Sequence, residues 1–406
     1  MLPSLNYDSN DPKFTLLSKI FKIISSKKVL NIYNRNGITN RKMMDLSIKV
    51  IFISMFFDYP ISKVVDELNR SSKLRKFCGF SDEIPTATQI YEYFTRYSAK
   101  QYCKIVNSIL NNYNKQRRGT IKHYIVDATP CACDFNKDKQ FITKEHLDKL
   151  GLKWGFSTTK GHFIGFKVTV VLDEASMIPV CILIHSGAPS DAKLFDNILK
   201  ELKRRRIIKK RDIIYFDRGY YSYKNYQIGI NKYKIVPAIF PKQSFSFKKL
   251  EGQMSYPLDI FKKNKHAKYL KSIINSITNK LYDLLKNWKD LKPIRGQIED
   301  FFKVAKNTFG LGQFHSYTTE SMYKNIYLCL LLTALVIQQG YETKTGMQRL
   351  GEGDVIQEKP IIKKSKKDKE KPENNNDKPT PYKTEQQKLA TVPKEKQSTL
   401  QFFTKI

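Results

Sequence analysis

The chain has 406 residues, with 72 Lys and Arg against 38 Asp and Glu, and a formal net charge of +34. Residues 351–396 contribute +3 of this and Lys405 contributes +1, so the first 350 residues carry +30. Such a positive charge favours binding of a polyanion, of which nucleic acid is the commonest. The alternative is an adaptation for solubility, a purpose that acidic residues usually serve better.

The cysteines argue against a zinc-knuckle protein, and the apolar runs argue against a membrane-spanning protein. Six cysteines are scattered, and Cys131 and Cys133 lack the spacing of a zinc knuckle, so reduced thiols of an intracellular protein are expected. The longest apolar run, residues 326–337, is too short to span a bilayer. We therefore expect a soluble, cytoplasmic protein with no membrane partner.

Residues 1–118 read as a helical domain. An apolar stretch over 43–53 breaks at Asp58-Tyr59-Pro60, residues 61–68 have helical spacing, and a further helix is predicted from Gln89. Basic connectors lie between these helices: Arg70, Lys73, Arg75 and Lys76. This pattern suits a helix-turn-helix-like reader of DNA. A helical packing or dimerisation domain would look the same.

The middle of the chain alternates strands and helices. Strands are predicted over 123–126, 161–172, 177–185, 211–216 and 235–239, with a helix over 192–205. The order predicts an α/β fold, a mixed sheet flanked by helices, over residues 119–345.

Two acidic residues follow predicted strands. Asp127 and Asp217 would be neighbours if their strands pair in parallel. Ligand sites form at the carboxyl ends of such strands. Either could instead be a turn residue. Asp191 also competes as a site residue, although its place in the first turn of a helix already explains it.

A third carboxylate lies on a predicted helix over 294–306. Apolar residues at helical spacing form one stripe, and Arg295, Glu299 and Lys306 share another face. An ordinary amphipathic helix can carry the same ladder. Together with Asp127 and Asp217, however, Glu299 would complete an oxygen-rich pocket suited to Mg²⁺. Two such ions can activate a water or 3′-hydroxyl and stabilise the leaving oxygen.

These residues resemble those of the DDE transposases of prokaryotic insertion sequences, in the branch with a Tyr-x2-Arg-x3-Glu-x6-Lys signature. Arg295, Glu299 and Lys306 match this spacing, while Lys292 stands at the position of the tyrosine. Other blocks resemble the family in order over residues 120–340: 125–127, 165–167, 187–191 and 216–220.

The resemblance implies an RNase H-like catalytic domain that cuts and joins DNA. Asp127, Asp217 and Glu299 would be its catalytic and metal-binding residues, holding two Mg²⁺ or Mn²⁺ ions per site. The cations Arg295, Lys306, Lys303 and Arg218 would contact DNA. The partners would be double-stranded DNA, both terminal inverted repeats and target, bound by a homodimer. A Lys-rich segment over about 225–290 would hold the transposon end.

The last part of the chain differs in composition. Residues 346–396 are rich in Lys, Glu, Asn and Pro and are predicted to be a disordered linker. Residues 397–406 resemble the PCNA-interacting peptide of sliding-clamp partners, with Gln397, Leu400, Phe402 and Phe403 as the binding residues. One residue rather than two separates Leu400 from the Phe pair. The likeness implies a PCNA-type clamp as partner and an archaeal host, with the protein at the nucleoid.

Two other functions stay open on the sequence alone. One is an RNase H-like nuclease or resolvase that cuts without joining. The other is a domesticated DNA-binding protein that has lost catalysis; the complete set of three acidic residues argues against it.

Overall fold

The computed structural model describes residues 5, 7–81, 83–113, 120–133, 144–157, 161–254, 265–312 and 318–339. The predicted linker over 346–396 and clamp-binding peptide over 397–406 lie outside these residues. So does a part of the predicted end-holding segment, residues 255–264.

The N-terminal third is helical within its described residues. Its helices are α1 (Pro12–Ile24), α2 (Lys27–Arg35), α3 (Arg41–Phe57), α4 (Ile61–Arg70), α5 (Ser72–Cys78), α6 (Ala87–Arg96) and α7 (Ala99–Tyr113). The apolar stretch predicted over 43–53 is the buried part of α3, which ends where Asp58 adopts a left-handed conformation. Helix α6 begins two residues before the predicted Gln89, because Thr86 and Gln89 form a capping box.

The basic connectors of this region divide into two kinds. Arg70 pairs with Glu67 (N···O 3.6 Å), and the Arg75 guanidinium donates to the Asn69 carbonyl at 3.1 Å. These two arginines therefore stabilise the end of α4, which a single residue joins to α5. Lys73 and Lys76 are exposed on α5.

Six strands form one mixed sheet: β1 (His123–Ala132), β2 (Lys153–Ser157), β3 (Gly161–Asp173), β4 (Pro179–Ser186), β5 (Ile213–Phe216) and β6 (Val236–Ile239). The long β3 pairs antiparallel with β1, β2 and β4, while β1, β5 and β6 pair in parallel. The predicted mixed α/β class is thus confirmed. Strand β1 extends past its predicted end, since residues 127–132 continue the ladder with β3. Strand β2 was not predicted.

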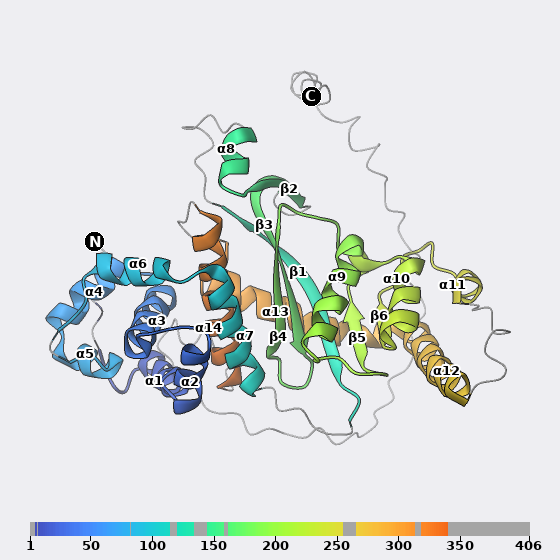
Figure 1. The fold of residues 1–406 in the computed structure, drawn as a ribbon, viewed down its shortest axis with the longest axis horizontal. Coiled ribbons are helices and arrows are strands. Elements are labelled where there is room, and N and C mark those ends of the chain that lie inside the picture. The colour runs from blue at the N-terminus through green and yellow to red at the C-terminus, as the bar shows by residue number, and fades with distance from the viewer. Residues whose placement is uncertain are drawn as a thin grey trace, which may run out of the picture. The chain divides into compact units, whose positions relative to one another are not determined.

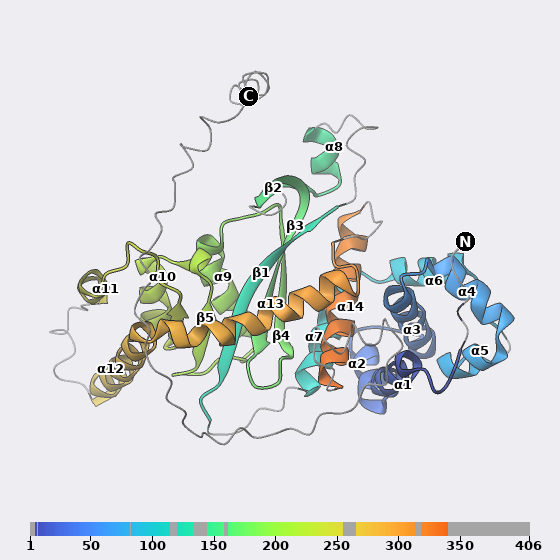
Figure 2. The same ribbon diagram turned by 180° about the vertical axis from the view of Figure 1, so that it is seen from behind.

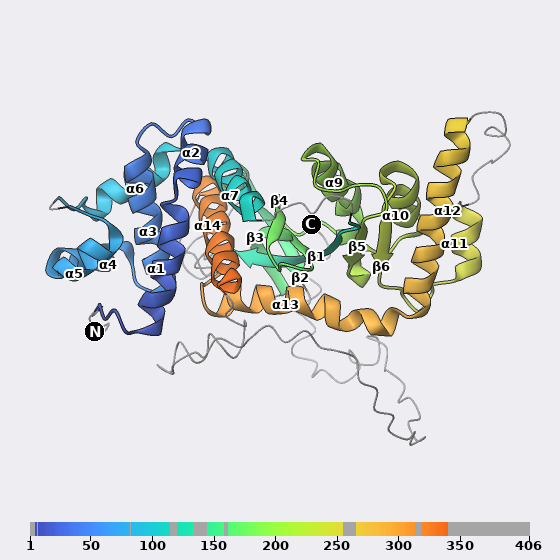
Figure 3. The ribbon, with the colours of Figure 1, turned by 90° about the horizontal axis from the view of Figure 1, so that it is seen from below.

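Helices cover both faces of this sheet. The remaining helices are α8 (Lys144–Lys149), α9 (Asp191–Arg204), α10 (Tyr223–Gln227), α11 (Phe247–Met254), α12 (Lys265–Lys286), α13 (Lys292–Asn307) and α14 (Thr319–Gln338). Helices α9 and α10 lie on one face (Figure 1), and α13 crosses the opposite face over β1 and β5 (Figure 2). The view from below shows the sheet between these layers (Figure 3).

Helix α14 joins the sheet to the N-terminal helices. It packs beside α7 and also contacts α1, α3, α13 and β4. Its Lys324 ammonium donates to the Phe94 carbonyl at 3.0 Å, and its Glu320 carboxylate accepts from the Ala99 N–H at 2.6 Å. Among the described helices, α14 is the one long and apolar enough to cross a membrane, but 72% of its apolar window is buried inside the protein. This burial identifies it as a core helix.

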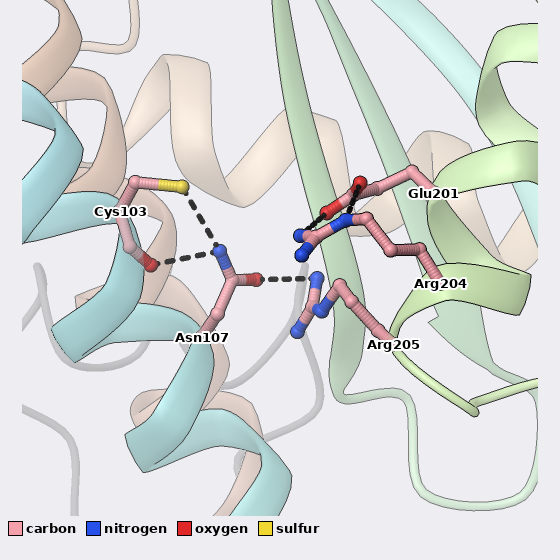
Figure 4. A network of polar contacts seen from close by, with 5 residues as sticks. All are labelled: Cys103, Asn107, Glu201, Arg204 and Arg205. Carbon is pink, nitrogen blue, oxygen red and sulfur yellow. Dashed lines mark hydrogen bonds and ion pairs between the residues drawn. The ribbon is translucent and has the colours of Figure 1, made fainter.

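A second link runs between α7 and the end of α9 (Figure 4). The Asn107 amide oxygen accepts from the Arg205 guanidinium at 3.0 Å, and its amide nitrogen donates to the Cys103 carbonyl at 2.8 Å. Next to it, Arg204 and Glu201 form a bidentate pair within α9. The helical third and the sheet are therefore held together by polar contacts as well as by α14.

Candidate active site

Two of the predicted acidic residues lie side by side in the sheet. Val126 of β1 is in register with Phe216 of β5, so the residues that follow, Asp127 and Asp217, are neighbours across a parallel pair. The prediction that these strands pair in parallel is correct. Asp127, however, lies inside β1 rather than at its end, while Asp217 comes directly after β5.

Helix α13 brings the third carboxylate to Asp217. The Arg295 guanidinium lies between two carboxylates, 3.0 Å from Asp217 Oδ1 and 3.1 Å from Glu299 Oε1. Arg295 and Glu299 are four residues apart and so share one face of the helix. The buried residues of α13, Ile298, Phe301, Phe302, Val304 and Ala305, pack this helix against the core. The predicted apolar stripe therefore fixes which face meets the sheet.

A pocket of about 430 Å³ opens above this arrangement. Its lining residues are Asp217, Arg218, Phe240, Trp288, Lys292, Arg295, Gly296 and Glu299. Three of them are cations, and the side chains of Asp217, Arg295 and Glu299 are 32%, 33% and 44% exposed. A ligand from solvent can therefore reach the two carboxylates and the arginine.

Trp288 and Phe240 are the aromatic residues that line the pocket, and neither was among the predicted site residues. The Lys292 ammonium lies 5.1 Å from the centroid of the Trp288 ring, a cation–π contact, and Phe240 meets the same ring edge-on. Lys292, at the signature tyrosine's position, thus faces the pocket. The four-residue spacing of Trp288 and Lys292 was the signal in the sequence that could have predicted their contact.

The charge of Asp127 is the least compensated of the three. Burial raises the pKa of its carboxyl to about 7; the Ala128 N–H, which donates to Asp127 Oδ1 at 2.7 Å, opposes the shift. Asp217 raises the pKa further, and Arg295 lowers it. Two neighbouring carboxylates in a poorly solvated site are the situation in which a bound cation stabilises the ionised form.

The remaining predicted DNA contacts lie elsewhere on α13. The Lys303 ammonium pairs with Asp300 at 3.0 Å on the exposed face of the helix. Lys306 is seven residues beyond Glu299, about 10 Å along the helix. Neither lysine lines the pocket, whereas Arg218 does.

Asp191 is the first residue of α9, and its charge also raises the pKa of the Asp127 carboxyl. Its carboxylate pairs with the Lys167 ammonium at 2.7 Å, and Lys167 also donates to the Pro189 carbonyl. The Asp191 carboxylate also lies next to Gly219, in the short 3-10 turn η1 (Arg218–Tyr220) that follows Asp217. Asp191 thus supports the loop that carries Asp217.

The three carboxylates do not form one compact cluster. Within the described part of the chain, no group of three or more His, Cys, Asp and Glu residues lies close enough to hold one ion together. Asp127 adjoins Asp217 on the neighbouring strand. Between Asp217 and Glu299 lies the Arg295 guanidinium, at the position where a metal cation would lie. The chemistry of three carboxylate donors and the raised pKa of Asp127 nevertheless fit a hard divalent cation.

The comparison with protein families decides the identity of this domain. Residues 118–335, more than half of the chain, match the family described as Transposase DDE domain. The chain belongs to the DDE transposase family. No curated protein matches it. The matched range of this DDE transposase includes β1, β5 and α13, and therefore Asp127, Asp217 and Glu299.

Proposed function

We propose that this DDE transposase cleaves DNA at the ends of an insertion sequence and joins the ends to target DNA, using two Mg²⁺ or Mn²⁺ ions. The observation that supports this most is the convergence of Asp217 and Glu299 on Arg295, with Asp127 beside Asp217 on the adjacent parallel strand. A mixed sheet with acidic residues on two central strands and an acidic helix across one face also supports an RNase H-like domain.

In this proposal Asp127, Asp217 and Glu299 hold the metal ions. Bound ions supply a means to activate a water or 3′-hydroxyl and to stabilise the leaving oxygen. In the metal-free chain, Arg295 pairs with both Asp217 and Glu299, and its single positive charge offsets only one of their two negative charges. Its guanidinium also lies at the pocket, where it can bind a phosphate oxygen.

The other cations of the pocket would position the DNA strand. Arg218 and Lys292 come from opposite sides, one from the turn after β5 and one from the start of α13. Both offer hydrogen-bond donors to a phosphodiester, which fixes the position of the strand without reading its sequence. Lys303 and Lys306, farther along α13, would contact DNA outside the pocket.

A strand-transfer assay with pre-cleaved 3′-hydroxyl ends and Mg²⁺ tests the catalytic proposal. Asp217→Asn should reduce the rate about a thousandfold, since several kcal/mol of metal-dependent stabilisation would be lost. Asp300→Asn, which removes an exposed acid on α13, should retain the wild-type rate. Cleavage without joining would identify a nuclease or resolvase, and no metal-dependent nicking by wild type would leave a DNA-binding protein.

Outside the catalytic domain, we propose that the N-terminal helices bind the transposon ends and that the protein works as a dimer on DNA. Of the four basic connector residues, Lys73 and Lys76 on α5 are exposed, and their side chains make neither an ion pair nor a hydrogen bond among the described residues. Lys73→Gln/Lys76→Gln should weaken binding to the terminal repeat.

We also propose that residues 397–406 bind a PCNA-type sliding clamp and that the host is an archaeon. This proposal rests on the sequence of Gln397, Leu400, Phe402 and Phe403 alone. A peptide of residues 390–406 should bind the clamp, and Phe402→Ala/Phe403→Ala should abolish binding. Equal affinity of the two peptides would remove the clamp from the proposal.

A further inference from the structure

A second polar pocket lies in the helical third of the chain, between α2 and α7. It has a volume of about 520 Å³ and is lined by Lys28, Asn31, Ile32, Arg35, Asn36, Ser108, Asn111 and Asn112. None of these residues belongs to the active-site pocket. Two cations, four amides and one hydroxyl in a groove this size form a set of hydrogen-bond donors without a counter-charge.

Of the seven polar side chains that line this groove, only that of Asn36 is used in a hydrogen bond among the described residues. Asn36 donates its amide to the Ile32 carbonyl at 2.8 Å. The side chains of the other polar lining residues make no hydrogen bond or ion pair among the described residues: Lys28, Asn31, Arg35, Ser108, Asn111 and Asn112. A structural role in joining α2 to α7 therefore does not account for them.

The walls of the groove carry no negative charge. Neither α2 nor α7 contains an acidic residue. Asp45, on the neighbouring α3, is buried and pairs with Lys49 at 2.8 Å. An anion entering the groove therefore meets cations and amide donors but no carboxylate of its walls.

The position of Lys28 argues against a role in helix stability. A cation in the last turn, such as Arg35, interacts favourably with the helix dipole, but one in the first turn interacts unfavourably. Lys27 and Lys28 both occupy the first turn of α2. A phosphate bound in the groove would offset this penalty, because it would pair with the Lys28 ammonium.

We propose that the α2–α7 groove binds the phosphodiester backbone of double-stranded DNA, as an anchoring contact separate from the catalytic pocket. Lys28 and Arg35, one on each end of α2, would each neutralise a phosphate, and Asn31 and Asn111 would donate to phosphate or sugar oxygens. The proposal rests on the proposed function only in taking DNA as the ligand.

The salt dependence of DNA binding tests it in the full-length protein. Equilibrium binding of a labelled DNA duplex is measured between about 50 and 200 mM salt for wild type and Lys28→Gln/Arg35→Gln. In the variant, the slope of log K against log salt should be less negative by about 2. Its affinity near 100 mM salt should be at least about tenfold lower. Lys193→Gln/Lys200→Gln, which changes two exposed lysines of α9, is the matched control and should leave both quantities unchanged.

A second variant separates hydrogen bonding from charge. Asn31→Ala/Asn111→Ala should weaken duplex binding several-fold with the wild-type salt slope, because no counterion is involved. An unchanged slope in Lys28→Gln/Arg35→Gln, or an equal loss in the α9 control, would overturn the proposal. So would tight binding of inorganic phosphate that requires Lys28 and Arg35 while duplex binding does not.

Cleavage assays distinguish this proposal from the catalytic one. Asp217→Asn should bind the duplex with the wild-type salt slope and fail to cleave it, whereas Lys28→Gln/Arg35→Gln should lose affinity and salt slope whether or not cleavage occurs. If wild type cleaves no DNA, the proposed function fails, but the binding measurements still decide the role of the groove.

Discussion

At the scale of single residues, the site holds three carboxylates with only one arginine paired to them among the described residues. Arg295 is shared by Asp217 and Glu299, and neither carboxylate has a separate cation in the described pocket at the distances that define an ion pair. Asp127 has a raised pKa because burial and the charge of Asp217 both disfavour its ionised form. This arrangement weakens the folded protein and leaves carboxylate oxygens available to a ligand.

The raised pKa predicts how the stability of the metal-free protein depends on pH. The pKa of Asp127 is about 7 in the folded chain against 3.8 without its surroundings, so the folded state holds this proton more tightly. This contribution to stability is therefore present in acid and is lost as the pH rises from about 4 to 7, by about 2–4 kcal/mol.

The measurement is urea denaturation in chelator at a series of pH values. Asp127→Asn should abolish this part of the pH dependence and be more stable than wild type at neutral pH. Asp300→Asn should keep the wild-type profile. If Asp127→Asn and wild type lose stability in parallel between pH 4 and 7, Asp127 is not the group responsible.

At the scale of elements, the site depends on how α9 supports the turn after β5. Gly219 lies in that turn, two residues after Asp217. A Cβ atom there would come within 2.8 Å of Asp191 Oδ2 and 3.3 Å of Asp191 Cβ. Asp191 is itself held by Lys167, so it cannot move away without breaking an ion pair.

Gly219→Ala should therefore displace Asp217 and lower the cleavage rate at saturating DNA by about ten- to a hundredfold, since small misplacements are costly in catalysis. DNA affinity should change little. Gly252→Ala on α11, where a Cβ atom meets nothing within 4 Å, is the matched control. It should keep the full rate and gain about 0.5–1 kcal/mol of stability. Equal rates for both variants would mean that Gly219 tolerates a side chain.

The sequence predicted the strands and the acidic residues better than their surroundings. Periodicity located β3, β4, β5, β6 and α13, because each buries a continuous apolar face. It ended β1 at Asp127, since Asp and Pro usually end strands, but Pro130 lies in the ladder and the strand continues. The placement of Arg295 and Glu299 on one face followed from their spacing, but the contact of Arg295 with Asp217 could not be predicted, because it depends on how α13 crosses the sheet.

At the scale of the whole molecule, α14 makes the helical third and the catalytic sheet share one core. The sequence suggested a boundary near residue 118, where composition changes from helical to strand-like. In the structure, α14, which follows the six strands of the sheet in the chain, packs against α7, which precedes them. The buried residues of α7, Tyr102, Ile105, Val106, Ile109 and Leu110, belong to the same apolar cluster as those of α14.

A fragment of residues 1–113 should therefore not fold by itself. Without α14, the buried face of α7 is exposed, and the Phe94 and Thr95 carbonyls lose the Lys324 ammonium that donates to them. Each lost partner of a buried polar group costs about 1–3 kcal/mol, in addition to the lost apolar burial.

Circular dichroism during urea denaturation should show no cooperative transition for the fragment, and a single transition for residues 1–345. Lys324→Met in the longer protein should lower the midpoint of that transition, whereas Lys200→Met on the exposed side of α9 should not. A cooperative transition in the fragment would show that the N-terminal helices form an independent domain, and that α14 only docks against it.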